Sequence, residues 1–147
     1  MRSILTQQEA DTLLKIEKYY RDDKQFTFPY CGEKLEILLY SNDEREEFIM
    51  SIESGRIKLT KNTFQTRTRR SIVLVRLEIN GAPHRNPDGE EIACPHLHLY
   101  REGFDDKWAT PLPDFFKNPD DAWETLNEFM DFCAVITKPI INKELFT

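Results

Sequence analysis

The chain holds three histidines, and all of them lie within a stretch of fifteen residues in the segment APHRNPDGEEIACPHLHLY. His96 and His98 are one residue apart and are followed by Tyr100, while His84 lies upstream. Imidazole titrates near neutral pH, so it can accept or donate a proton, and its unprotonated nitrogen is a common metal ligand. The cluster therefore indicates acid–base chemistry, a metal site, or a packed face whose histidines are purely structural.

The segment around the histidine pair alternates as a β-strand does, and alternate residues of a strand share a face. We therefore expect His96, His98 and Tyr100 on one face of a sheet. Leu97 and Leu99 would point the other way, into the core beneath the helices. The histidine face would then be the more open one.

The strongest predicted strand covers residues 71–79, and its apolar face consists of Val73, Val75, Leu77 and Ile79. Arg76 and Glu78 belong to the opposite face of that strand. Because sequential strands usually pair, we expect these two charged residues near the histidine pair. This placement would put a guanidinium beside two imidazoles.

The leading hypothesis is metal-independent cleavage of RNA, in which the 2′-hydroxyl supplies the nucleophile and two imidazoles act as base and acid. Arginines would bind the phosphate and stabilise the charge that develops on it. The residues assigned to this site are His96 and His98 as the acid–base pair, His84 and Tyr100 as supporting groups, and Arg76, Arg67 and Arg69 as phosphate ligands. The mechanism requires neither a cofactor nor a metal.

Two alternatives stay open. In the first, the three histidines bind Zn²⁺ or another divalent ion and leave one position for water. In the second, the protein is not an enzyme but an acidic protein that binds and modulates another protein.

Charge is unevenly distributed along the chain. The segment from Arg56 to Arg85 contains eight Lys or Arg residues and one acid, Glu78, although the whole chain has a net charge of −6. Such asymmetry can attract an anionic ligand, and RNA is the ligand that we expect. The more common explanation of such a segment is a solvated strand edge that charges protect from aggregation.

A chain of 147 residues with 39% hydrophobic residues predicts one globular domain over residues 1–147. It has no apolar run of about 18 residues, as a membrane helix needs, and no secretory signal is evident. We therefore expect a cytoplasmic protein without membrane contact. Cys31, Cys94 and Cys133 lack CxxC spacing, so we expect inert thiols rather than a disulfide framework.

The order of predicted elements is helix, several strands, helix. Thr6 and Glu9 form a capping-box pattern that predicts a helix over about residues 7–21, and Asn118-Pro119 begins a last helix that ends before Lys138-Pro139. Residues 53–56 look like a tight hairpin, and residues 63–69 like an exposed strand. The fold class is therefore α+β: an antiparallel, meandering β-sheet with the N-terminal and C-terminal helices packed on one face.

The central block, GRIKLTKNTFQTRTRRSIVLVRLEINGAPHRNPDGEEIACPHLHLYREGFDDKWATPLP, resembles a family of small uncharacterised bacterial and prophage proteins. The resemblance extends to the closing helix and to ELF near the end. A shorter part is similar to TumE-like toxins of toxin–antitoxin systems: Arg76 on its strand, then Ala82-Pro83-His84, then Pro95-His96-Leu97-His98. That similarity implies an RNA-directed growth inhibitor with a cognate antitoxin as its partner.

Overall fold

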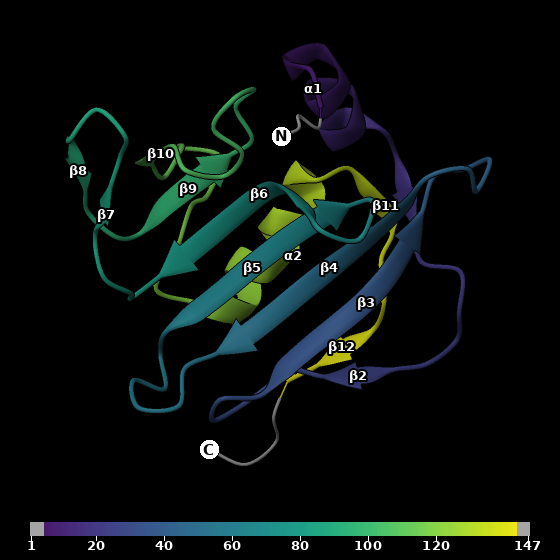
Figure 1. Ribbon diagram of the computed structural model, residues 1–147. Coiled ribbons are helices and arrows are strands. Elements are labelled where there is room, and N and C mark those ends of the chain that lie inside the picture. The colour runs from purple at the N-terminus through teal and green to yellow at the C-terminus, as the bar shows by residue number, and fades with distance from the viewer. Residues whose placement is uncertain (1–4, 144–147) are drawn as a thin grey trace.

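An eight-stranded sheet forms the centre of the molecule (Figure 1). The structure is a computed structural model that describes residues 5–143. The strand order is β10-β9-β6-β5-β4-β3-β1-β11, and all neighbours are antiparallel except β1 and β11. The strands are β1 (Lys18–Tyr19), β3 (Lys34–Tyr40), β4 (Glu47–Ser54), β5 (Asn62–Thr68), β6 (Ile72–Ile79), β9 (His96–Leu99), β10 (Ala109–Pro111) and β11 (Val135–Thr137).

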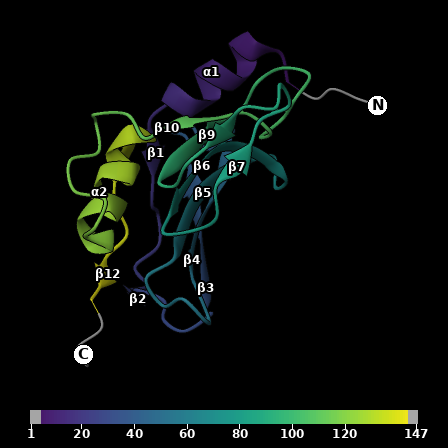
Figure 2. The same cartoon turned by 90° about the vertical axis from the view of Figure 1, so that its left-hand side faces the viewer.

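Helices and short ribbons complete the α+β fold that the sequence predicts. Helix α2 (Ala122–Phe132) covers one face of the sheet, and α1 (Gln7–Lys15) lies across one end of it (Figure 2). Two small ribbons are added: β2 (Phe26–Thr27) with β12 (Ile141–Asn142), and β7 (His84–Arg85) with β8 (Glu91–Ile92). Neither helix is long and apolar enough to cross a membrane.

Strand β5 lies in the middle of the sheet, so the prediction of an exposed strand over residues 63–69 is wrong. Its alternate residues Phe64, Thr66 and Thr68 are fully buried on the α2 side. The ring of Phe64 packs 5.9 Å from that of Phe129 in α2, and the Thr66 hydroxyl lies 3.4 Å from the sulfur of Cys133. Threonine is a polar residue, and the burial of Thr66 depends on the contact of its hydroxyl with Cys133, which is distant in sequence.

The first helix begins as predicted but ends earlier. The capping box of Thr6 and Glu9 is present, whereas Ile16 is already extended and the expected continuation to residue 21 is wrong. The ammonium group of Lys18 turns inward and donates to the carbonyl oxygens of Leu14, Ile16 and Cys133, at 2.8–2.9 Å. These bonds satisfy carbonyls at the helix end, and the chain proceeds into β1. Burial lowers the pKa of Lys18 to about 8.

Two other boundaries differ from expectation. Helix α2 is capped by Asp121 rather than Asn118, and its continuation as far as Ile136 is wrong, because Ile136 belongs to the edge strand β11. The tight hairpin at residues 53–56 is a longer connection, in which Ile57 is 96% exposed. The sequence ELF lies outside the described residues.

Candidate functional site

The pairing of β6 with β9 brings the predicted charged residues to the histidine pair. Arg76 lies opposite His98, and Glu78 lies opposite His96. Directly opposed residues share a face of an antiparallel sheet, so these four side chains point the same way. Leu97 points to the other face and is fully buried in the core, as predicted. Leu99, also expected there, is 36% exposed because it lies near the end of β9.

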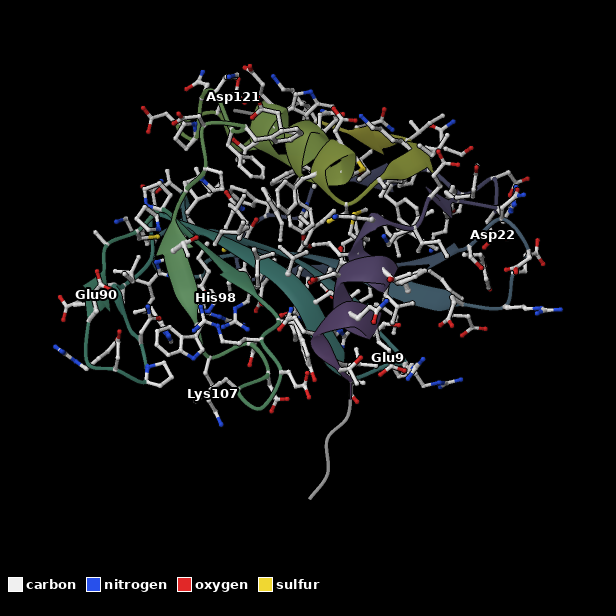
Figure 3. The ribbon with its side chains drawn as sticks, turned by 90° about the horizontal axis from the view of Figure 1, so that it is seen from above. Glu9, Asp22, Glu90, His98, Lys107 and Asp121 are labelled. Carbon is white, nitrogen blue, oxygen red and sulfur yellow. The ribbon has the colours of Figure 1, made fainter. Side chains whose placement is uncertain are left out.

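The histidine face is covered, not open as expected. His96 and His98 are each 1% exposed, although they point away from α2. Figure 3 shows His98 between the sheet and the loop that carries Lys107. The β7–β8 hairpin, which precedes β9 in the chain, lies on the same side as this loop, which follows β9. Together the two segments cover the polar face of β9.

The hairpin brings His84 into the cluster. The side chain of Asn86 fastens the hairpin to β10, because it donates to the Ala109 carbonyl at 2.9 Å and accepts from the Ala109 amide at 2.8 Å. The ring centroid of His84 lies 4.6 Å from that of His98 and 6.0 Å from that of His96. All three histidines of the chain therefore converge.

The rings of His84 and His98 have defined tautomers. Nδ1 of His98 lies 2.9 Å from the backbone carbonyl oxygen of Asp106, and Nε2 of His84 lies 2.7 Å from that of Lys107. A carbonyl can only accept, so each of these nitrogens carries the hydrogen. A nitrogen of Arg76 is 3.4 Å from Nδ1 of His98, but that contact is not a hydrogen bond, since both atoms are donors.

Several nitrogens of this cluster are left without partners. Neither ring nitrogen of His96, nor Nε2 of His98, forms a hydrogen bond of standard geometry among residues 5–143. The backbone of Ala93 nevertheless lies close enough to the His96 ring to favour its charged form. Nε2 of His98 lies 3.9 Å from Oε2 of Glu78. One ligand atom each from Glu78, His96 and His98 can be chosen so that all three lie within 4.8 Å of one another.

Burial disfavours the charged form of both imidazoles. Burial lowers the pKa of His96, although the carboxylate of Glu78 and the backbone of Ala93 act in the opposite direction. Burial, and then the positive charge of Arg76, lower the pKa of His98 to about 4. Neutral imidazoles can bind a metal ion without first releasing a proton.

Arg76 organises the acidic side of the cluster. Its Nε donates to Glu78 at 3.0 Å, and its Nη1 forms an ion pair with the carboxylate of Asp106. Sequence reasoning placed Glu78 nearby but did not single it out as a ligand, and it missed Asp106 entirely. No strand pattern could identify Asp106, because it comes from an irregular loop.

The other predicted site residues lie elsewhere. The hydroxyl of Tyr100 bonds to the backbone of Leu5 and not to a histidine. Arg67 is paired with Glu36 on the open face of the sheet, and Arg69 lies in the turn between β5 and β6. The basic segment is therefore divided among several places and does not form one surface.

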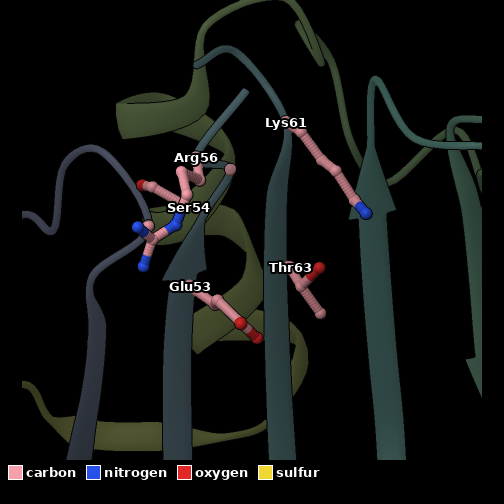
Figure 4. Close-up of a pocket in the computed structure, with 7 residues that line it drawn as sticks. Glu53, Ser54, Arg56, Lys61 and Thr63 are labelled. Atoms are coloured by element: carbon pink, nitrogen blue, oxygen red, sulfur yellow. The ribbon is translucent and has the colours of Figure 1, made fainter. Parts of the chain in front are cut away.

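A cavity of about 360 Å³ lies where β4 ends and β5 begins, at the end of these two strands away from the turn that holds Arg69 (Figure 4). It is lined by two cations, Arg56 and Lys61, and by Glu53. Figure 4 shows the side chains of Arg56 and Lys61 pointing in different directions, so they do not converge on one anion.

Comparison with known proteins gives one match. No curated protein and no solved structure matches the chain. The model of a family of unknown function, DUF6978, matches residues 5–135, which include the whole histidine cluster. Since the match covers most of the 147 residues, the protein belongs to this family.

Proposed function

We propose that the protein binds a divalent transition-metal ion, with Zn²⁺ as the best-fitting candidate, through Glu78, His96 and His98. The observation that carries this proposal is the set of buried imidazole nitrogens without partners beside a carboxylate. Leaving a buried polar atom unsatisfied costs about 1–3 kcal/mol, so such atoms are expected to have a ligand. Two imidazoles and a carboxylate form a known ligand set for zinc.

The surroundings of the cluster support the same proposal. A metal-binding histidine usually donates its second ring nitrogen to a carbonyl or carboxylate, which fixes its orientation. His98 does so toward the Asp106 carbonyl, and this leaves Nε2 facing Glu78. Zinc lies about 2.0–2.2 Å from its ligands, a geometry that ligand atoms within 4.8 Å of one another can reach through small side-chain movements. His84 is adjacent and could occupy a fourth position after a rotation of its ring.

The test is metal content and affinity. Tag-free protein, treated with a chelator and then titrated with Zn²⁺ against a competing indicator, should bind about one ion per chain. Glu78→Gln should weaken the affinity at least about tenfold, and His98→Gln should weaken it more. Glu90→Gln, at an exposed position of the hairpin turn, is the matched control.

Spectra of each variant keep the result interpretable. Glu78 is partly exposed, so its substitution should leave the circular dichroism spectrum unchanged even where His98→Gln disturbs the fold. Folded wild-type protein that binds no Zn²⁺ at micromolar concentration would contradict the proposal. Equal affinity of wild type and Glu78→Gln would contradict the assignment of Glu78.

RNA cleavage by the histidine pair stays a second proposal. The presence of His84 and Arg76 beside His96 and His98 is what supports it. A general acid must carry a proton, however, and burial lowers the pKa of both members of the pair. The lowered pKa values argue against the general-acid role, and the arrangement of Glu78, His96 and His98 favours metal binding. Incubation with total RNA in the presence of a chelator tests cleavage, and His96→Ala/His98→Ala should abolish it if it occurs.

The proposal of RNA cleavage includes a toxin-like role for the protein and a cognate antitoxin as its partner. A cytoplasmic location is supported by Cys31, Cys94 and Cys133, which are free thiols and not disulfides. Co-purification of the untagged protein with a partner would test the alternative in which it binds and modulates another protein.

A further inference from the structure

The turn between β5 and β6 contains two consecutive arginines in an unusual backbone conformation. Arg69 has φ of 50° and Arg70 has φ of 72°. Two successive positive φ values are typical of a type I′ turn, for which Asn-Gly is the favoured pair. The left-handed conformation is unfavourable for any L-residue with a long side chain. The protein therefore keeps two arginines where other residues would stabilise the fold.

These arginines lie beside an open cavity of about 530 Å³. Its lining is Leu38, Arg45, Glu46, Glu47, Ile49, Arg69 and Arg70. Leu38 and Ile49 are directly paired on β3 and β4, and Leu38 is 39% exposed, so the sheet contributes an apolar floor. The cavity thus joins an apolar surface to a basic rim.

The arginines that line this cavity form few hydrogen bonds and ion pairs within the protein. Within residues 5–143, neither Arg69 nor Arg70 forms a side-chain hydrogen bond or an ion pair, although the positive charge of Arg69 acts on the exposed carboxylate of Glu9 in α1. Arg45 has only a 3.9 Å contact with exposed Asp43. Glu46 and Glu47 also line the cavity, so its lining contains three arginines and two glutamates. The net positive charge favours an anion, and guanidinium groups bind phosphate oxygens in a bidentate manner.

We propose that this cavity binds a nucleotide, with the phosphate on Arg69 and Arg70 and the base against Leu38 and Ile49. The nucleotide is either free or part of a single-stranded RNA. Backbone strain that persists in a stable fold is characteristic of functional positions, and here both strained residues line the cavity. The site is separate from the histidine cluster and does not depend on metal binding.

The decisive variant is Arg69→Asn/Arg70→Gly. It removes both guanidinium groups and introduces the residues that the turn favours, so the melting temperature should rise by about 3 °C or more. Binding of adenosine monophosphate, followed by amide chemical shifts, should become at least about tenfold weaker. A loss of binding in a more stable protein cannot be attributed to misfolding. Arg85→Gln, which removes an exposed arginine from the β7–β8 hairpin, is the control.

A further variant and further ligands separate the contributions of the rim charge, the phosphate and the length of the nucleic acid. Glu47→Gln should strengthen binding, because it removes a negative charge from the rim. Adenosine should bind more weakly than adenosine monophosphate. Tighter binding of a short single-stranded oligoadenylate than of the mononucleotide would identify an RNA strand as the ligand, whereas equal or weaker binding would identify the free nucleotide.

Several results would overturn the proposal. They are the absence of binding of both adenosine monophosphate and oligoadenylate at millimolar concentration, unchanged affinity in Arg69→Asn/Arg70→Gly, and equal affinity for adenosine and its monophosphate. Shifts that leave the amides of Leu38 and Ile49 unaffected would place the ligand elsewhere and overturn it as well.

Discussion

Nδ1 of His98 lies 2.9 Å from the backbone carbonyl oxygen of Asp106, and this contact decides which nitrogen of the ring is free. The hydrogen must be on Nδ1, so Nε2 carries the lone pair and faces the carboxylate of Glu78 at 3.9 Å. Because the acceptor is a backbone atom, the orientation depends on the path of the loop and not on a side chain. The loop thus prepares an unprotonated nitrogen in the interior of the protein.

Substitution of Arg76 should weaken metal binding. Arg76 holds the carboxylate of Glu78 in place, so Arg76→Gln should reduce the affinity for Zn²⁺ about 10–100-fold, as is typical for partners of metal ligands. The control is Arg67→Gln, which breaks an ion pair with Glu36 on the open face of the sheet. Competitive titration of both variants measures the difference, and a similar loss in both would argue against a role for Arg76.

Removing the hydroxyl of Tyr100 should affect stability alone. The hydroxyl donates to the Leu5 carbonyl at 2.7 Å and accepts from the Leu5 amide at 3.1 Å. Tyr100→Phe leaves both buried backbone groups without a partner, so the free energy of unfolding should fall by about 1–3 kcal/mol. Urea unfolding measures this change, with exposed Tyr30→Phe as the control. An altered affinity for Zn²⁺ in Tyr100→Phe would mean that the Tyr100 hydroxyl contributes to the metal site.

Asn86 should control the position of His84. Asn86→Ala removes both hydrogen bonds to Ala109, which should cost about 1–3 kcal/mol and release the β7–β8 hairpin. Hydrogen exchange of the hairpin amides should become faster than that of the central strands. Asn118→Ala, at an exposed position before α2, should leave both measurements unchanged. Unaltered exchange in the hairpin of Asn86→Ala would show that other contacts hold it.

Lys18 should make the protein more stable as the pH rises above 8. Its pKa is about 8 in the folded protein and has the ordinary value of 10.5 when the chain unfolds. Between these values the unfolded chain binds more protons, so the free energy of unfolding increases with pH. Cys133 acts oppositely, since burial raises the pKa of its thiol from 9.0 to about 11. The clearest window is therefore pH 8–9.

The comparison of Lys18→Met with wild type isolates this contribution. Urea unfolding at several pH values should show a rise for wild type that is missing in Lys18→Met. Lys15→Met, at the end of α1, should retain the rise. Parallel profiles for wild type and Lys18→Met would mean that the ammonium group is not desolvated.

Local patterns predicted much of the architecture. The capping box at Thr6, the strand over β6 and the apolar residues of α2 depend on neighbours in sequence, so they could be predicted. The end of α1 could not, because Lys18 finds one of its three acceptors on Cys133, far along the chain. The central position of β5 was missed for a similar reason: burial of Thr66 depends on α2.

The same division applies to the candidate site. Alternation along β9 determined that His96 and His98 share a face opposite Leu97, and the order of strands indicated Arg76 and Glu78 as neighbours. Only the tertiary structure decided that this face is covered, that His84 folds back onto it, and that Asp106 completes it. The physical reason is that strand alternation is set by local backbone geometry, whereas the enclosure of the histidines depends on where the β7–β8 hairpin and the loop after β9 pack against the sheet. The positions of these two segments depend on single contacts between distant residues, such as Asn86 with Ala109. Such contacts leave no periodic pattern in the sequence.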